Sequence, residues 1–181
     1  MTLVQLGIPR SLDLANLPRA EIPGLYVHIP FCFHKCHYCD FYSLAGHLDR
    51  AEPFLDALAT EIDLHRRARN HRPLRPSTIF IGGGTPTLFL PPHLQRLLRL
   101  STAAIDPSAL IEFTVEANPN TFDPDRAAIL AAAGVNRLSF GAQSFIPEEL
   151  RTLQRDHDPE SVPDAFQLAR AAGIHNLNLD L

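Results

Sequence analysis

The chain contains 3 cysteines, and all of them lie within one short segment. Cys32, Cys36 and Cys39 form a C-x₃-C-x₂-C pattern inside "PFCFHKCHYCDF". Thiolates at this spacing can wrap around one face of a [4Fe–4S] cluster, in which each of the four irons takes a terminal ligand. Three cysteines would leave one iron open to bind another molecule. The spacing therefore favours an iron–sulfur cluster with an open site.

A zinc site is an alternative that the same residues leave open. Cys32, Cys36 and Cys39 with His34 or His37 would supply the nitrogen and sulfur ligands of a tetrahedral zinc ion. Structural zinc sites more often use two separated ligand pairs, and zinc would not explain the glycines described below. A third interpretation is that the cysteines are incidental buried residues. Three thiols cannot all pair internally, so a disulfide framework is not expected.

Composition places the chain among ordinary globular proteins. Its 181 residues are enough for one domain with a substantial core, and 45% of them are hydrophobic and 20% charged. The formal net charge of −4 does not suggest a nucleic-acid partner. No apolar stretch approaches the roughly 18 residues of a membrane span, and no signal-peptide pattern opens the chain. We therefore expect a cytoplasmic protein with reduced thiols and, at most, transient membrane contact.

Strands and helices are expected to alternate after an N-terminal lead over residues 1–24. Short apolar runs bounded by glycine, proline or polar residues predict strands, and apolar residues three or four apart predict helices. The strands are expected at residues 25–30, 77–84, 110–119, 136–145 and 174–181, and the helices within residues 52–69, 91–100, 123–134 and 158–173. Asp123 as N-cap and Gly134 as stop bound the third helix, and residues 158–173 repeat this arrangement.

This alternation predicts an α/β fold of βαβ units with a parallel sheet. Polar or glycine residues gather where the strands end: the three cysteines, Gly82 to Gly84, Glu116 to Asn118, Gln143 and Asp180. In barrels and in doubly wound sheets alike, ligands lie at the carboxyl ends of parallel strands. The pattern leaves both architectures open, but in either one these five groups should face one cavity. Because the chain ends at Leu181, inside the fifth predicted strand, we also expect a truncated form of a longer protein.

The segment "CFHKCHYCDF" resembles the cysteine loop of the radical S-adenosylmethionine (SAM) superfamily. Further segments resemble, in the same order, one branch of it, the oxygen-independent coproporphyrinogen III oxidases and HemW-type heme chaperones: "YVHIPFC", "IFIGGGTPTLF", "VEANP", "NRLSFGAQSF" and "NLDL". The resemblance implies a radical SAM core domain over residues 25–181. Its fold would be a partial TIM-like (β/α) barrel with five strands, lacking a sixth strand and a C-terminal domain.

The residues after the cysteines resemble the chaperone more than the oxidase. In the oxidases the last cysteine of the loop is typically followed by glycine and a fourth cysteine, whereas Asp40 and Phe41 follow Cys39 here. "EANP" from Glu116 also resembles the chaperones, since the oxidases more often have "EVDP". The resemblance thus implies a protein that binds heme and transfers it to an acceptor protein. The alternative is a SAM-dependent oxidase that decarboxylates coproporphyrinogen III, so it is open whether the protein is an enzyme; an electron donor is implied as a partner.

The resemblance also implies the SAM contacts and their chemistry. The open iron would chelate the amino and carboxylate groups of SAM, and one electron from the reduced cluster would break a carbon–sulfur bond to release a 5′-deoxyadenosyl radical. The residues at matching positions are Tyr26, Tyr38, Gly83, Gly84, Thr85, Glu116, Gln143, Arg155 and Asp180. The absence of side chains at the glycines would let the backbone approach the methionine end of SAM closely.

Several of these residues also have plainer interpretations. A glycine run after a strand can be a simple turn, and Tyr26 and Tyr38 can be packing aromatics. Arg155 can be an ordinary surface residue. Glu116 lies in an apolar strand, where burial without a partner would be costly, and a ligand ammonium or ribose hydroxyl would satisfy it. His28 in the first strand is expected to be a satisfied core histidine.

Overall fold

Five parallel strands form the central sheet of the protein, whose computed structural model describes residues 22–181. The sheet has the order β1-β4-β5-β6-β7, and its strands are β1 (Ile22–Ile29), β4 (Pro76–Gly83), β5 (Glu112–Ala117), β6 (Arg137–Gly141) and β7 (Asn176–Asp180). The predicted lead over residues 1–24 falls mostly outside the described residues. Residues 22–24 of that lead belong to β1.

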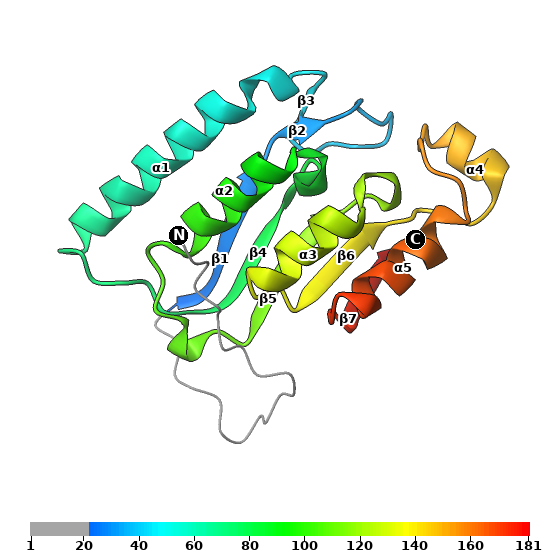
Figure 1. Cartoon of the computed structure of the whole chain (residues 1–181). Helices are drawn as coiled ribbons and strands as arrows, with labels where there is room; N and C mark the ends of the chain where they lie inside the picture. Colours follow the sequence, from blue (N-terminus) through cyan, green and yellow to red (C-terminus); the bar gives the residue numbers. More distant parts are fainter. Residues whose placement is uncertain (1–21) are drawn as a thin grey trace.

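The connections between the strands are helical. They contain α1 (Ala51–Ala68), α2 (Pro91–Thr102), α3 (Pro124–Ala132) and α5 (Ser161–Ala171). The strands lie side by side in chain order, and Figure 1 shows α1, α2, α3 and α5 on one face of the sheet, as right-handed crossovers require. A doubly wound sheet requires a reversal of strand order. The sheet has none, so the predicted partial (β/α) barrel is confirmed.

Short elements near the strand ends were not predicted, because they are too brief to show a periodic pattern. They are β2 (Phe31–Cys32), β3 (Leu44–Ala45), α4 (Pro147–Thr152) and the 3₁₀ helices η2 (Leu48–Arg50), η3 (Pro86–Leu88), η4 (Pro107–Ala109) and η5 (Pro119–Thr121). The prediction that the fourth strand extends to residue 145 is wrong, since β6 ends at Gly141. Gln143 then takes a left-handed conformation with a φ of 67° that a strand cannot contain.

The two predicted helix caps had different outcomes. Asp123 caps α3 as predicted, and its carboxylate accepts a hydrogen bond from the Arg126 backbone N–H. At the fourth helix the predicted N-cap is wrong, because α5 begins at Ser161 and its N-cap residue, Glu160, makes no side-chain cap. The predicted stop is confirmed, because α5 ends at Ala171 and Gly173 follows it with a φ of 90°. The segment before Ser161 instead extends to the functional site described below, where Arg155 and Asp156 line a cavity.

Alternate residues of each strand face the helices or the opposite face of the sheet. The helix-facing residues form the core and include the fully buried Ile79, Ile81, Phe113, Val115, Leu138 and Phe140. On the opposite face, strand register aligns polar or glycine positions: His28 lies beside Gly82, and Ser139 lies between Glu116 and Asn178. The inward face of the barrel is therefore polar near the carboxyl ends of the strands.

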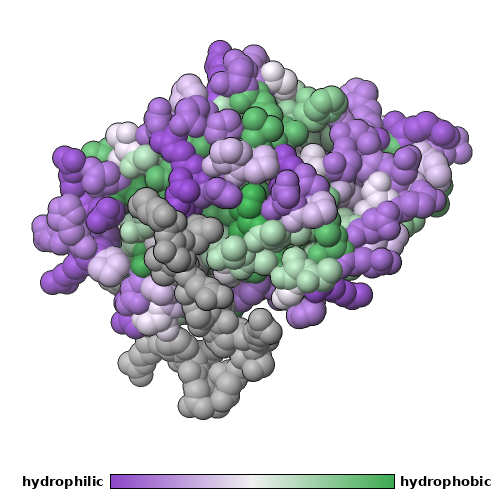
Figure 2. All heavy atoms as spheres, viewed as in Figure 1, coloured by the Kyte–Doolittle hydropathy of each residue, from purple (hydrophilic) through white to green (hydrophobic). Residues whose placement is uncertain are grey.

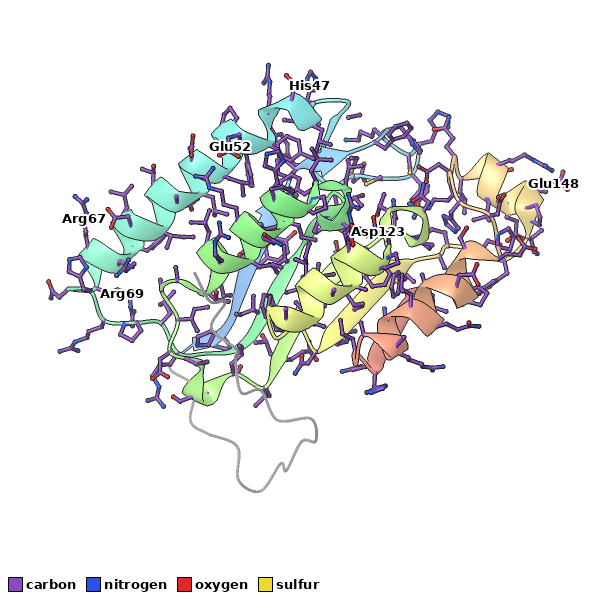
Figure 3. All side chains as sticks on the ribbon, in the orientation of Figure 1. His47, Glu52, Arg67, Arg69, Asp123 and Glu148 are labelled. Carbon is purple, nitrogen blue, oxygen red and sulfur yellow. The ribbon has the colours of Figure 1, made fainter. Side chains whose placement is uncertain are left out.

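The outer face of the helices is largely hydrophilic, with hydrophobic side chains visible between the helices (Figure 2). Arg96 of α2 reaches both Glu52 and Asp56 of α1 at 2.5 Å and joins the two helices. Glu52 is labelled on α1 in Figure 3. Within residues 22–181, none of the helices combines the length and apolar character needed to cross a membrane.

Candidate functional site

One cavity lies at the carboxyl ends of the strands and gathers nearly all the predicted site residues. Its lining includes Cys32, Cys36, Cys39, Tyr38, Gly83, Gly84, Thr85, Glu116, Gln143, Arg155 and Asp180. Tyr26 is the exception among the predicted residues, because it does not line this cavity. Its ring lies 6.0 Å from the ring of Phe80, on the inward face of the sheet and farther from the carboxyl ends of the strands than the cavity. The expectation that sequence-distant groups meet at one cavity is otherwise met.

The three thiols of the cysteine loop (residues 32–39) are free and half-buried. The loop starts in β2, and a turn in which the Cys39 N–H donates to the Cys36 carbonyl at 3.1 Å folds it back. Burial raises the pKa of the Cys32 thiol, the neighbouring Ser43 and Thr85 side chains lower this pKa, and nearby Cys39 and Cys36 raise it. Neighbouring thiolates repel one another, and a positively charged metal centre would relieve that repulsion.

The contacts of His34 bear on the zinc alternative, in which this histidine could supply the fourth ligand. Within residues 22–181, no group of three or more His, Cys, Asp or Glu side chains is placed to hold a metal ion. His34, a candidate fourth zinc ligand, has its Nε2 3.7 Å from Cys36 Sγ and hydrogen bonded to the Gln154 carbonyl. The ring is thus already engaged by the protein.

The glycines at the end of β4, Gly82 to Gly84, are required by the chain's own packing. The N–H groups of Gly84 and Thr85 donate to the carbonyls of Ile29 and Phe31 at 2.6 and 2.7 Å, which ties this segment to β1 and β2. A Cβ at Gly84 would collide with the Phe31 carbonyl. The glycine segment is therefore more than a simple turn. The close approach of a ligand to it stays a prediction.

Glu116 extends from β5 into the cavity, where it already has a partner in the chain. The backbone N–H of Gly83 donates to Glu116 Oε2 at 2.8 Å. Burial raises the pKa of the carboxyl group, the Gly83 hydrogen bond lowers it, Asp180 raises it and His28 lowers it. The carboxylate thus has one partner within the chain, and the ligand contact expected for it stays a prediction.

Arg155 is half-buried, so the interpretation as an ordinary surface residue is wrong. Its guanidinium donates to the side chain of Asn118 and, at 2.5 Å, to the Gly141 carbonyl. Gln143 is held nearby, because its backbone N–H donates to the Asp180 carbonyl at 2.7 Å. These contacts join the ends of β5, β6 and β7 around the cavity.

Sequence reasoning missed two polar residues of the inward face. Ser139 lines the cavity and donates to the Asp180 carboxylate at 3.2 Å, and Asn178 donates to the same carboxylate at 2.8 Å. Each lies two residues before a cavity residue on its own strand, Gly141 or Asp180. Since alternate strand residues share a face, this spacing of two was the signal that could have identified them.

The aromatic and histidine residues near the site divide into two groups. Tyr38 is 47% exposed and lines the cavity. Burial raises its pKa, while the nearby Arg155 lowers it. His28 is half-buried, so its expected place in the core is wrong, but its ring nitrogens have partners as expected: they lie 2.9 Å from the Tyr26 hydroxyl and 2.8 Å from the Tyr42 carbonyl. Tyr26 and His28 thus support the sheet below the cavity.

Comparison with protein families and curated proteins gives consistent matches. The model of the radical SAM superfamily matches residues 26–181. The heme chaperone HemW of Bacillus subtilis is 42% identical over 157 residues, covering 86% of this chain and 41% of the relative. The oxygen-independent coproporphyrinogen III oxidase of Paracoccus denitrificans is 35% identical over 181 residues, covering 97% of this chain and 39% of the relative.

A solved structure resembles the protein over the same region. Coproporphyrinogen III oxidase (HemN) from Escherichia coli, described as a radical SAM enzyme, superposes with a TM-score of 0.77 and 36% identity. The match covers 89% of this chain and 37% of that structure. The chain therefore spans about 40% of the length of the curated relatives it matches. The matched region is 41% of the HemW relative and 39% of the oxidase relative.

Proposed function

Since this chain belongs to the radical SAM superfamily, we propose that Cys32, Cys36 and Cys39 bind a [4Fe–4S] cluster and that the open iron of this cluster binds SAM. The observation that carries the proposal is the meeting of the three thiols with the predicted SAM contacts around one cavity. When bound, the cluster and SAM supply one-electron chemistry, namely reductive cleavage of SAM to a 5′-deoxyadenosyl radical. The protein supplies position and shelter from water.

Different residues around the cavity would bind different parts of SAM. The backbone of Gly83 and Gly84 and the hydroxyl of Thr85 would hold the methionine end, beside the thiols. Glu116 offers a carboxylate to an ammonium or ribose hydroxyl, and Tyr38 offers an aromatic face to adenine. Gln143, Arg155 and Asp180 complete the polar lining. Tyr26 stays a predicted contact that lies outside the cavity.

For the protein as a whole we propose the role of a heme chaperone, which binds heme and transfers it to an acceptor protein in the cytoplasm. Support comes from Asp40 and Phe41, which follow Cys39 in place of the glycine and fourth cysteine typical of the oxidases, and from the 42% identity to the HemW of Bacillus subtilis. Electron transfer to the cluster would need a donor protein. The second candidate is coproporphyrinogen III oxidation, supported by the E. coli structure with a TM-score of 0.77.

Anaerobic reconstitution with iron and sulfide tests the cluster. We expect the wild-type chain to take up iron and acid-labile sulfide, and a Cys32→Ala, Cys36→Ala, Cys39→Ala triple variant to take up neither. A wild-type protein as colourless and iron-free as the triple variant would contradict the proposal. Bound zinc without sulfide would establish the zinc alternative instead.

Heme titration and a coproporphyrinogen assay on the reconstituted protein separate the two functions. The chaperone proposal predicts a Soret band from bound heme, transfer of that heme to an apo-acceptor, and no loss of coproporphyrinogen III when SAM and a reductant are present. Turnover of coproporphyrinogen III without stable heme binding would favour the oxidase.

A further inference from the structure

We propose that His34 is a positioning residue that fastens the cysteine loop to the loop carrying Arg155, here called the arginine loop (residues 153–158). This inference rests on the proposed cluster and SAM site. The connecting contact is the hydrogen bond that His34 Nε2 makes with the backbone carbonyl of Gln154. A carbonyl only accepts, so Nε2 carries the proton in this contact.

The arginine loop reaches the ends of two strands. The Arg155 backbone N–H donates to the Leu150 carbonyl at 2.8 Å, and its guanidinium donates to Asn118 after β5 and to Gly141 at the end of β6. The position of this loop thus decides where Arg155 lies in the cavity. His34 adds an attachment to the cysteine loop.

Cys36 lies beside this attachment. Its Sγ lies 4.0 Å from the Gln154 carbonyl oxygen and 3.7 Å from His34 Nε2. The His34 ring therefore lies where a thiol of the cysteine loop meets a backbone carbonyl of the arginine loop.

Gln154 lies just after the C-terminus of α4. Its φ of 54° is uncommon for a residue other than glycine, and the N–H groups of Gln154 and Arg155 donate to the carbonyls of Arg151 and Leu150 at 3.1 and 2.8 Å. Such a conformation persists only where surrounding contacts hold it. Without His34, the arginine loop loses its attachment to the cysteine loop, and Arg155 is held less firmly in the cavity.

Three substitutions of His34 test the idea in the 181-residue chain without added iron. In His34→Gln the side-chain amide nitrogen can reach about as far as Nε2, whereas His34→Asn is too short and His34→Ala has no donor. We expect amide hydrogen exchange over residues 153–158 to be about 3- to 10-fold faster in His34→Ala and His34→Asn, the range for one lost hydrogen bond, and near wild type in His34→Gln. Exchange in β5 serves as the internal reference and should not change.

SAM binding to the reconstituted proteins provides the second measurement. At equal iron content, Kd for SAM should rise about 3- to 10-fold in His34→Ala and His34→Asn and return to the wild-type value in His34→Gln. Unchanged exchange over residues 153–158 in both weakened variants, or a His34→Gln variant that behaves like His34→Ala, would overturn the inference. If His34→Ala does not fold by circular dichroism, the comparison of His34→Gln with His34→Asn decides. A wild-type chain without a cluster would defeat the proposed function, while the exchange measurement would still test His34.

Discussion

The backbone N–H of Gly83 donates a 2.8 Å hydrogen bond to the carboxylate of Glu116, which joins the last residue of β4 to the neighbouring strand β5. Gly83 has a φ of 110°, and the ring of His28 occupies the space that a Cβ would need. The pair lies on the lining of the cavity. One hydrogen bond therefore links the glycines at the end of β4 to the half-buried carboxylate of β5.

A methyl group at Gly83 should disturb this link. We expect Gly83→Ala to lower the free energy of unfolding by about 2–4 kcal/mol, because it combines a strained backbone with a collision against His28. Gly173→Ala is the matched control, since Gly173 has a φ of 90° but nothing within 4 Å of the added Cβ. The control should lose only about 1 kcal/mol. Urea unfolding of both variants measures the difference, and equal losses would contradict the steric argument.

Glu116 should make the protein less stable as the pH rises. Its folded pKa is raised above the ordinary 4.5, mainly by burial, so the folded state binds more protons than the unfolded state above that pH. The stabilising contribution is complete below pH 4.5 and is lost as the pH passes through the raised pKa. Each pH unit in this window changes stability by up to about 1.4 kcal/mol.

The variant Glu116→Gln, which keeps an acceptor for Gly83, should remove this dependence. Urea unfolding of the wild type and the variant between pH 4 and pH 8, roughly the range that brackets the titration, measures the difference in slope. Parallel curves for the two proteins would show that Glu116 does not titrate with a raised pKa.

His157 should have the opposite effect. Its side chain is 5% exposed, and burial lowers its pKa, with Arg155 lowering it further while Asp156, the Ala142 backbone and Asp158 raise it. The folded state therefore binds fewer protons than the unfolded state below the ordinary value of 6.5, and stability present above pH 6.5 is lost as the pH falls through the depressed pKa.

His157→Gln should remove this loss, again by up to about 1.4 kcal/mol per pH unit. The exposed His175 provides the control substitution, His175→Gln, which should keep the wild-type slope. Urea midpoints measured at pH values of about 5 to 7.5 compare the three proteins. If His157→Gln retains the wild-type slope, another group causes the acid sensitivity.

The cap of α3 should contribute measurably to stability. The Asp123 carboxylate accepts from the Arg126 backbone N–H at 2.8 Å and pairs with the Arg126 guanidinium, which also donates to the Phe89 carbonyl at 2.9 Å. Asp123 is labelled at the start of α3 in Figure 3. Asp123→Ala should cost about 1–2 kcal/mol in thermal or urea unfolding. Asp125→Ala, an exposed residue in the same first turn, should cost about 0.5 kcal/mol or less, and a similar loss in both variants would argue against the cap.

Much of the fold could be predicted from the sequence, because its signals are local. The period of apolar residues identified the strands and the four long helices, and the capping sequence at Asp123 placed the start of α3 within a residue. The spacing of Cys32, Cys36 and Cys39 predicted metal chemistry because only neighbouring residues are needed to define such a loop. Gly83 and Gly84 were identified in the same way, from the end of a strand.

The tertiary structure decided what depends on distant parts of the chain. Strand order excluded the doubly wound sheet, and register brought Ser139 and Asn178 beside the cavity. The hydrogen bond between His34 and Gln154 joins residues 120 positions apart, and neither residue type predicts this contact from the sequence. Periodicity, caps and ligand spacing are properties of a few adjacent residues, whereas partners across strands and loops are fixed only when the sheet has formed and long-range packing has set their distances.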